Sequence, residues 1–96
     1  MVELYNDYVV SVDSYNYILQ KRMIVQKGKT AGQETFKNVG YFSTFGGAIN
    51  CFHQELLRDQ LMKEDYKSLE EAVRVCHEVN ERFGDWLKDN SMLINA

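Results

Sequence analysis

The chain has no proline, two cysteines and no long hydrophobic run in its 96 residues. Two cysteines are too few for the disulfide framework of a small secreted domain. Acidic residues stand near the N-terminus, where a signal peptide needs a basic start followed by an apolar stretch. The longest uncharged stretch, residues 38–54, is interrupted by Gly, Ser, Thr and Asn, unlike a membrane-spanning helix. We therefore expect a cytoplasmic protein with reduced thiols and no membrane partner.

Repeats and low-complexity segments are also missing from the sequence. Hydrophobic residues make up 45% of the chain and charged residues 26%, which is ordinary for a globular protein. The length is near the usual size of one domain. These features predict a single domain over residues 1–96, with loose termini at 1–7 and 90–96.

Three segments in the first half have the composition or the alternation of β-strands: 8–12, 15–26 and 35–42. In the middle segment the odd positions from Tyr17 to Val25 are mostly apolar and the even positions mostly polar. This pattern is typical of a half-buried strand whose odd face meets the core. Asp13 and Ser14 indicate a turn, and the glycines within 27–34 indicate a flexible hairpin loop. The expected sheet is a three-stranded antiparallel meander.

Two amphipathic helices are predicted to follow the sheet. Ser43 or Thr44 can cap the first, whose apolar residues recur at spacings of three and four until about residue 62. Ser68 and Glu71 have the spacing of a capping box at the start of the second. Its predicted apolar face comprises Leu69, Ala72, Val73, Cys76, Val79, Phe83, Trp86 and Leu87. The predicted fold class is α+β, a three-stranded antiparallel β-meander followed by two amphipathic α-helices packed on one face.

Three motifs hold catalytic or metal-binding residue types without the required spacing. The Gly-Lys-Thr at 28–30 imitates the end of a P-loop, but it lacks the upstream glycine and joins two predicted strands. Cys51 and His53 are separated by about 200° around a helix axis, so they cannot hold one metal ion. The acidic pairs at 64–65 and 70–71 stand near a helix start, where they complement the helix dipole. We therefore expect no enzyme, no cofactor and no metal site.

Charge is unevenly distributed along the chain. Residues 1–43 hold five basic and four acidic side chains, whereas residues 44–96 hold six basic and ten acidic ones. Five basic residues fall within one short segment against the single acid Glu34: Lys21, Arg22, Lys27, Lys29 and Lys37. Most charged runs are simply solvated. The functional interpretation is an electrostatic patch for a phosphate backbone or an acidic partner.

Eight of the twelve aromatic residues fall within the first 45 positions. If both helices cover one face of the sheet, some of these rings, such as Tyr41, and the even-position residues Ile18 and Ile24 lie on the other face. Aromatic rings beside Arg and Lys can stack on unpaired bases. Tyr and Arg are also enriched in protein interfaces, so a dimer surface and an ordinary sheet with scattered tyrosines both stay open.

Four segments resemble one known group of proteins: Asn-Tyr-Ile-Leu at 16–19, the Gly-Lys loop at 28–29, the helix entry at 38–44 and Ser-Leu-Glu-Glu at 68–71. The chain resembles a family of small uncharacterised proteins from phages and prophages of Gram-positive bacteria. The resemblance implies an accessory gene product, not a virion part, that acts in the cytosol of the host bacterium. The glycine pair at 46–47 departs from the polar first turn of that family. No catalytic or binding residues carry over.

Small phage proteins of this build often bind host defence machinery, and anti-CRISPR proteins are the obvious class. The leading hypothesis is a non-enzymatic inhibitor of a host nucleic-acid-directed defence system, such as a CRISPR effector. Its predicted partner-binding residues are Lys21, Arg22, Lys27, Lys29, Lys37, Ile18, Ile24 and Tyr41. An acidic helical surface ranks second: Glu64, Asp65, Glu70, Glu71, Glu78 and Glu81. The alternatives are single-stranded nucleic-acid binding through the aromatic sheet face and a homodimer using Ile18 and Ile24.

Overall fold

The computed structural model describes residues 1–29 and 31–90, which belong to two compact units. The sheet unit comprises Met1–Phe52, and the helical unit begins at His53. The single domain expected from the sequence stays a prediction. Residues 91–96 of the expected loose C-terminus lie outside the described residues.

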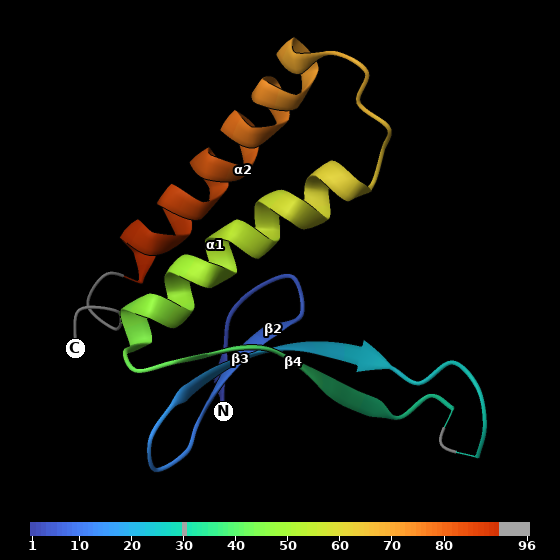
Figure 1. Ribbon diagram of the computed structural model, residues 1–96, viewed down its shortest axis with the longest axis vertical. Helices are drawn as coiled ribbons and strands as arrows, with labels where there is room; N and C mark the ends of the chain where they lie inside the picture. Colours follow the sequence, from blue (N-terminus) through green and yellow to red (C-terminus); the bar gives the residue numbers. More distant parts are fainter. Residues whose placement is uncertain (30, 91–96) are drawn as a thin grey trace. The chain divides into compact units, whose positions relative to one another are not determined.

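The sheet has four antiparallel strands in the order β1-β2-β3-β4, and their bounds are Val2–Glu3, Tyr8–Val12, Tyr17–Ile24 and Glu34–Phe42 (Figure 1). The predicted meander is confirmed for the last three strands, but the prediction of three strands in total was wrong. Strand β1 pairs with β2 at Val10 and Val9 and was missed because two residues are too short to show alternation.

A tight turn makes this additional strand possible. Asn6 and Asp7 join β1 to β2 with positive φ angles of 56° and 67°. The backbone N–H of Tyr8 donates to the carbonyl of Tyr5 across them. Positive φ at both central residues is the requirement of a type I′ hairpin turn, and Asn and Asp tolerate it better than most residues. The segment 1–7, expected to be a loose terminus, therefore contains a strand and its turn.

The β2–β3 turn forms where Asp13 and Ser14 predicted it. The Asp13 carboxylate accepts hydrogen bonds from the backbone N–H groups of Tyr15 and Asn16, at 2.8 and 2.6 Å. Between β3 and β4, Leu19 faces Gly40 and Gln20 faces Asn38, so β4 has one additional residue, Val39. Such a bulge changes which side chains share a face, because the alternation restarts beyond it.

The two faces of the sheet differ in what covers them. We call the helix face the one on which Tyr8, Val10, Tyr17 and Leu19 lie, because α1, Phe45–Met62, contacts it. Phe52 of α1 packs against Tyr5 and Tyr8, with ring centroids 5.1 and 5.3 Å apart. The fully or almost fully buried residues of this unit are Tyr8, Val9, Val10, Leu19, Ala48, Ile49 and Phe52.

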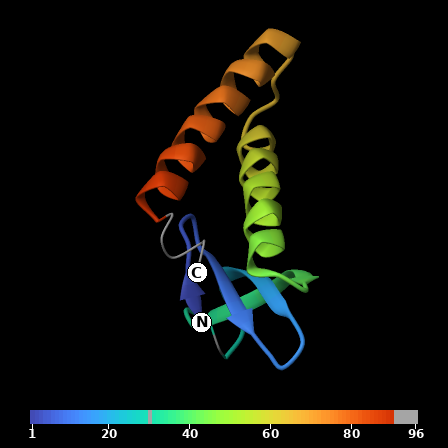
Figure 2. The same ribbon diagram turned by 90° about the vertical axis from the view of Figure 1, so that its left-hand side faces the viewer.

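Helix α1 begins directly after β4, as Figures 1 and 2 show. The Thr44 hydroxyl accepts a hydrogen bond from the backbone N–H of Gly47 at 3.0 Å, so Thr44 is the capping residue. This start and the end at Met62 confirm the first predicted helix. Packing of α1 on one sheet face is observed for its first two turns, and packing of the second helix there stays a prediction.

The helical unit contains the rest of α1 and α2, Leu69–Asp89. Ser68 caps α2 by accepting a hydrogen bond from the backbone N–H of Glu71 at 3.1 Å. His53 stacks on Phe83, with ring centroids 4.2 Å apart. The apolar face expected for α2 was partly wrong: Val75, which it omitted, is buried, whereas Leu69 is 81% exposed.

Candidate partner-binding surface

The predicted binding residues do not share one face of the sheet. We call the polar face the side opposite α1, whose side chains include Ser11, Ile18, Gln20, Arg22, Ile24, Glu34, Phe36, Asn38 and Tyr41. Of the predicted set, Arg22, Ile18, Ile24 and Tyr41 belong to it. Lys21 and Lys37 pair across β3 and β4 on the helix face. The sequence showed the alternation in β3 but not the register that assigns β4 residues to the same faces.

A chain of hydrogen bonds crosses the polar face from β2 to β4. Ser11 Oγ donates to Gln20 Oε1 at 2.6 Å, and Gln20 Nε2 donates to Asn38 Oδ1 at 2.8 Å. Asn38 Nδ2 then donates to the Tyr41 hydroxyl at 2.8 Å. Asn38 and Tyr41 are three residues apart yet share a face because the bulge at Val39 lies between them. The sequence did not predict this group of polar side chains, because only the register between the strands brings them together.

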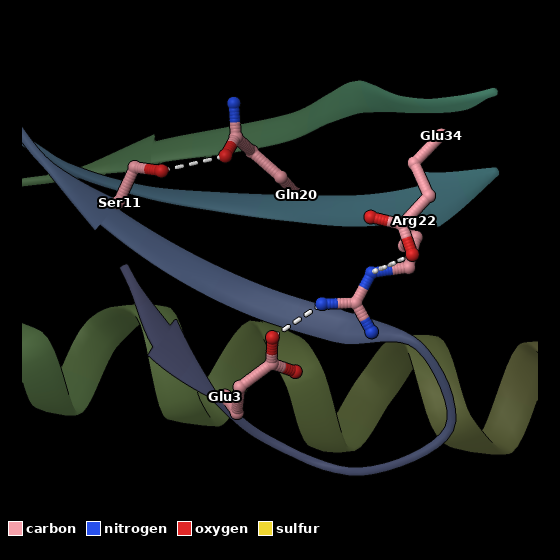
Figure 3. A network of polar contacts seen from close by, with 5 residues as sticks. All are labelled: Glu3, Ser11, Gln20, Arg22 and Glu34. Atoms are coloured by element: carbon pink, nitrogen blue, oxygen red, sulfur yellow. Dashed lines mark hydrogen bonds and ion pairs between the residues drawn. The ribbon is translucent and has the colours of Figure 1, made fainter.

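Arg22 is engaged by two carboxylates on the same face (Figure 3). Its Nη2 donates to Glu3 Oε1 of β1, and its Nε lies 3.7 Å from Glu34 Oε1 of β4. The hydrogen bond with Glu3 raises the pKa of Arg22 above its usual value, so the guanidinium stays charged. Because one cation meets two acids here, Arg22 contributes little positive charge for an external partner.

The apolar and aromatic members of the predicted site are partly exposed but not contiguous. Tyr41 is 58% exposed and Ile24 is 47% exposed. Ile18 lies opposite Tyr41, whereas Ile24 is six residues further along β3, or about 20 Å at the rise of a strand. The two isoleucines therefore do not form one patch, which weakens the homodimer interpretation.

The other basic residues gather on a projecting hairpin. The last β2–β3 pair is Tyr8 with Lys21, so residues 22–24 and 34–36 continue beyond β2 as a two-stranded ribbon (Figure 1). We call residues 22–29 and 31–36 the hairpin arm. Gly28 and Gly32 of its loop have positive φ angles of 92° and 88°, which glycine adopts without strain. Lys27 and Lys29 extend from this loop, and both are exposed.

Lys27, Lys29 and Lys37 make no ion pair with any residue that the structure describes. Lys37 stands at the base of the arm beside Lys21, whose Nζ lies 5.3 Å from the centroid of the Tyr8 ring. Positive charge in the sheet unit is therefore concentrated on the arm and its base. The polar face contributes little of it, because Arg22 lies beside two acids.

In the helical unit acidic side chains outnumber basic ones, ten to six. Cys76 lines a shallow groove of about 460 Å³ with residues of α1, where Arg58 is paired to Glu55 at 2.9 Å. His53 Nε2 lies 2.7 Å from Asn80 Oδ1.

Residues 1–29 and 31–90 contain no group of three metal-ligating side chains, and no described helix is long and apolar enough to cross a membrane. The predicted acidic residues are all exposed: Glu64, Asp65, Glu70, Glu71, Glu78 and Glu81.

Comparison with known proteins identifies one relevant relative. The chain is 33% identical over 57 residues to an uncharacterised 10.2 kDa protein in the GpA 5′ region of Escherichia phage P2. The match covers 58% of this chain and 63% of that protein, less than two thirds of its length. No family model and no solved structure matches.

This chain resembles a phage protein. The similarity supports the predicted phage origin at the level of a small protein of unknown function. It gives no support to a Gram-positive host or to an anti-CRISPR activity, because the relative belongs to an Escherichia phage and is itself uncharacterised.

Proposed function

We propose that this chain is a non-enzymatic phage accessory protein that binds a component of a host nucleic-acid-directed defence system, such as a CRISPR effector, and blocks it in the host cytosol. The hairpin arm is the binding element. The observation that carries the proposal is the set of exposed lysines on the arm and its base that have no acidic partner among the described residues: Lys27, Lys29 and Lys37.

Two further features of the arm support this role. Met23 and Ile24 lie on opposite faces of the ribbon and are 46% and 47% exposed, so each face of the arm offers apolar contact area. The arm is a two-stranded extension from a four-stranded sheet, which leaves both of its faces accessible to a partner. Exposed apolar residues beside uncompensated charge are typical of interaction surfaces.

Single-stranded nucleic-acid binding through the polar face has less support from the geometry. Stacking surfaces need accessible rings beside free cations. Here Tyr41 is exposed, but Arg22, the basic residue of that face, is engaged by Glu3 and Glu34. The arm is therefore the better candidate.

An interference assay in Escherichia tests the proposal. Cells with an active CRISPR system are transformed with a targeted plasmid while they express the wild-type chain, K27E/K29E/K37E or the control K63E/K67E/K88E. We expect wild type and control to restore transformation and the arm variant to fail. The control reverses the same number of exposed lysines in the helical half. Equal behaviour of the two triple variants, or no rescue across a panel of defence systems by wild type, would contradict the proposal.

A further inference from the structure

The two edges of the sheet differ in length. Strand β1 has two residues, whereas β4 has nine, and among the described residues no strand pairs with the outer side of β4. Natural proteins protect long edges with proline, lysine or bulges, because unpaired backbone groups otherwise pair with another chain. The chain has no proline, and the bulge of β4 lies at Val39. Residues 34–38 therefore form a regular edge, on which Lys37 is the one lysine.

A hydrogen bond of β3 shows which backbone groups of this edge point outward. The N–H of Arg22 donates to the carbonyl of Asp7 at 2.7 Å, so it points away from β4. Arg22 is paired with Phe36 across the two strands. In an antiparallel sheet, opposed residues exchange either both of their hydrogen bonds or none. The N–H and C=O groups of Phe36 therefore point away from β3.

A second hydrogen bond agrees with this direction. The N–H of Val25 donates to the carbonyl of Gln33 at 2.9 Å, so three residues further along, the backbone groups point between the strands. Because the direction alternates along a strand, the backbone groups of Glu34 and Asn38 point outward together with those of Phe36. Among residues 1–29 and 31–90, no hydrogen bond to the outer side of β4 is formed by these three residues.

We infer that this edge binds the same edge of a second copy of the chain, antiparallel, with a two-fold axis at Phe36. The inference does not rest on the proposed function. Phe36 then faces Phe36 of the second copy and Glu34 faces Asn38, so each outward-pointing residue exchanges two hydrogen bonds with its partner. Thr35 faces Lys37 of the second copy, and no like charges stand directly opposite each other.

The positions of the outward groups select this register. An axis at Thr35 or at Lys37 would leave one of the three outward-pointing residues without a partner on the regular edge. An axis at Lys37 would also place the two copies of this lysine directly opposite each other, which destabilises a sheet. An axis between two residues would pair the polar face of one copy with the helix face of the other. Only the axis at Phe36 pairs all three residues and continues each face.

The side chains of the edge also suit a second copy. Phe36 is half-buried, and the guanidinium carbon of Arg22 lies 5.8 Å from the centroid of its ring. A second Phe36 opposite it adds a cross-strand aromatic pair, which stabilises antiparallel sheets. Pairing in the plane of the sheet leaves both faces of the hairpin arm open.

Sedimentation velocity of the full chain at about 5 to 500 µM tests the inference through the charge at one position. Thr35 is exposed and faces the uncharged Met23 within its own sheet, so a directly opposed charge exists only in the dimer. T35E places a glutamate opposite Lys37 of the second copy, and T35K places a lysine there. We expect wild type to pass from monomer to dimer as its concentration rises. T35E should lower the dimer Kd by about 2- to 30-fold and T35K should raise it by a similar factor.

The net charge alone predicts the opposite order. T35E changes the net charge of the chain from −3 to −4 and T35K changes it to −2, so general repulsion between copies would favour T35K. S14E and S14K make the same changes in the exposed β2–β3 turn and are expected to show only this general effect. T35K/K37E exchanges the two charges across the axis, so it should recover the affinity that T35K loses.

Amide hydrogen exchange locates the interface within the strand. The outward N–H groups of Glu34, Phe36 and Asn38 should exchange quickly in the monomer and gain protection as the protein concentration rises. The N–H groups of Thr35 and Lys37 point toward β3 and should change little, so protection should follow an alternating pattern.

Three results would overturn the inference: wild type that stays monomeric at the highest concentration, equal dimerisation of T35E and T35K, or a dimer in which the three outward amides gain no protection. The last result would mean that the copies meet through another surface. Because these measurements need no host component, their outcome is independent of the interference assay.

Discussion

The sheet unit and the helical unit bury their apolar side chains to different extents. In the sheet unit Val9, Val10, Leu19 and Phe52 have no exposed surface. In the helical unit the most buried apolar residues, Leu56, Val75 and Phe83, keep 4%, 8% and 8% of their surface exposed, and Leu69 is 81% exposed. Both units leave some large apolar side chains exposed, but the completely buried ones belong to the sheet unit.

This difference indicates where stability originates. Because hydrophobic stabilisation scales with the apolar area removed from water, substitutions in the sheet unit should cost the most free energy of unfolding. The helical unit depends more on local features, such as the Ser68 cap and the acidic residues in the first turn of α2. A stable sheet unit is also what a projecting hairpin arm needs as its base.

The largest expected effect comes from the centre of the sheet core. Phe52→Ala removes a ring that contacts both Tyr5 and Tyr8, and we expect a loss of about 3–5 kcal/mol in the free energy of unfolding. Phe83→Ala is the matched change in the helical unit and should cost less. Urea denaturation followed by circular dichroism measures both. Equal losses would remove the proposed difference between the units.

Replacing one glycine by alanine in each unit should change the free energy of unfolding by an intermediate amount. A Cβ at Gly40 would lie 2.8 Å from the ring of Phe42, so Gly40→Ala should cost about 1–3 kcal/mol through overpacking. Gly84 of α2 has no neighbour within 4 Å of such a Cβ, so Gly84→Ala should stabilise the helix by up to about 1 kcal/mol. Thermal melting of both variants measures the sign. A stabilising effect of Gly40→Ala would show that the Phe42 ring can move away from residue 40 without cost.

The smallest effect concerns the cap of α2. Ser68→Ala removes the acceptor for the Glu71 backbone N–H and should cost about 1 kcal/mol. Hydrogen exchange should accelerate in the first turn of α2 and stay unchanged in β2 and β3, if the helical unit depends on local interactions. Ser14→Ala, in the exposed β2–β3 turn, is the neutral control. Faster exchange throughout the sheet would instead mean that the two units unfold as one.

Much of the fold was predictable because its signals are local. The strand at 8–12, the strand expected at 15–26 and observed at 17–24, the cap expected at Ser43 or Thr44 and the start of α2 after Ser68 all follow from patterns within a few residues. Strand β1 was not predicted, although Asn6-Asp7 is a turn signal that could have suggested a hairpin. The exposure of Leu69 was also missed, because an apolar stripe marks a helix face without showing how far a neighbour covers it.

The candidate site was predicted less completely than the fold. Composition located the basic segment, and alternation placed Arg22 and Ile24 on one side of β3. It did not show that Glu3 and Glu34 engage Arg22, because these acids come from other strands. Nor did it show that Lys37 faces Lys21 on the other side of the sheet.

The sequence by itself determined the order of strands β2 to β4, the two helices and the location of the positive charge. Periodicity, turn residues and caps act between neighbours in the chain, so they can be read without the fold. Only the tertiary structure decided which acidic side chains lie beside which basic ones. The β3–β4 register and the bulge at Val39 separate the lysines from the Glu3–Arg22–Glu34 cluster. Register depends on pairing between strands that are distant in sequence, and a shift of one residue would move every side chain to the opposite face.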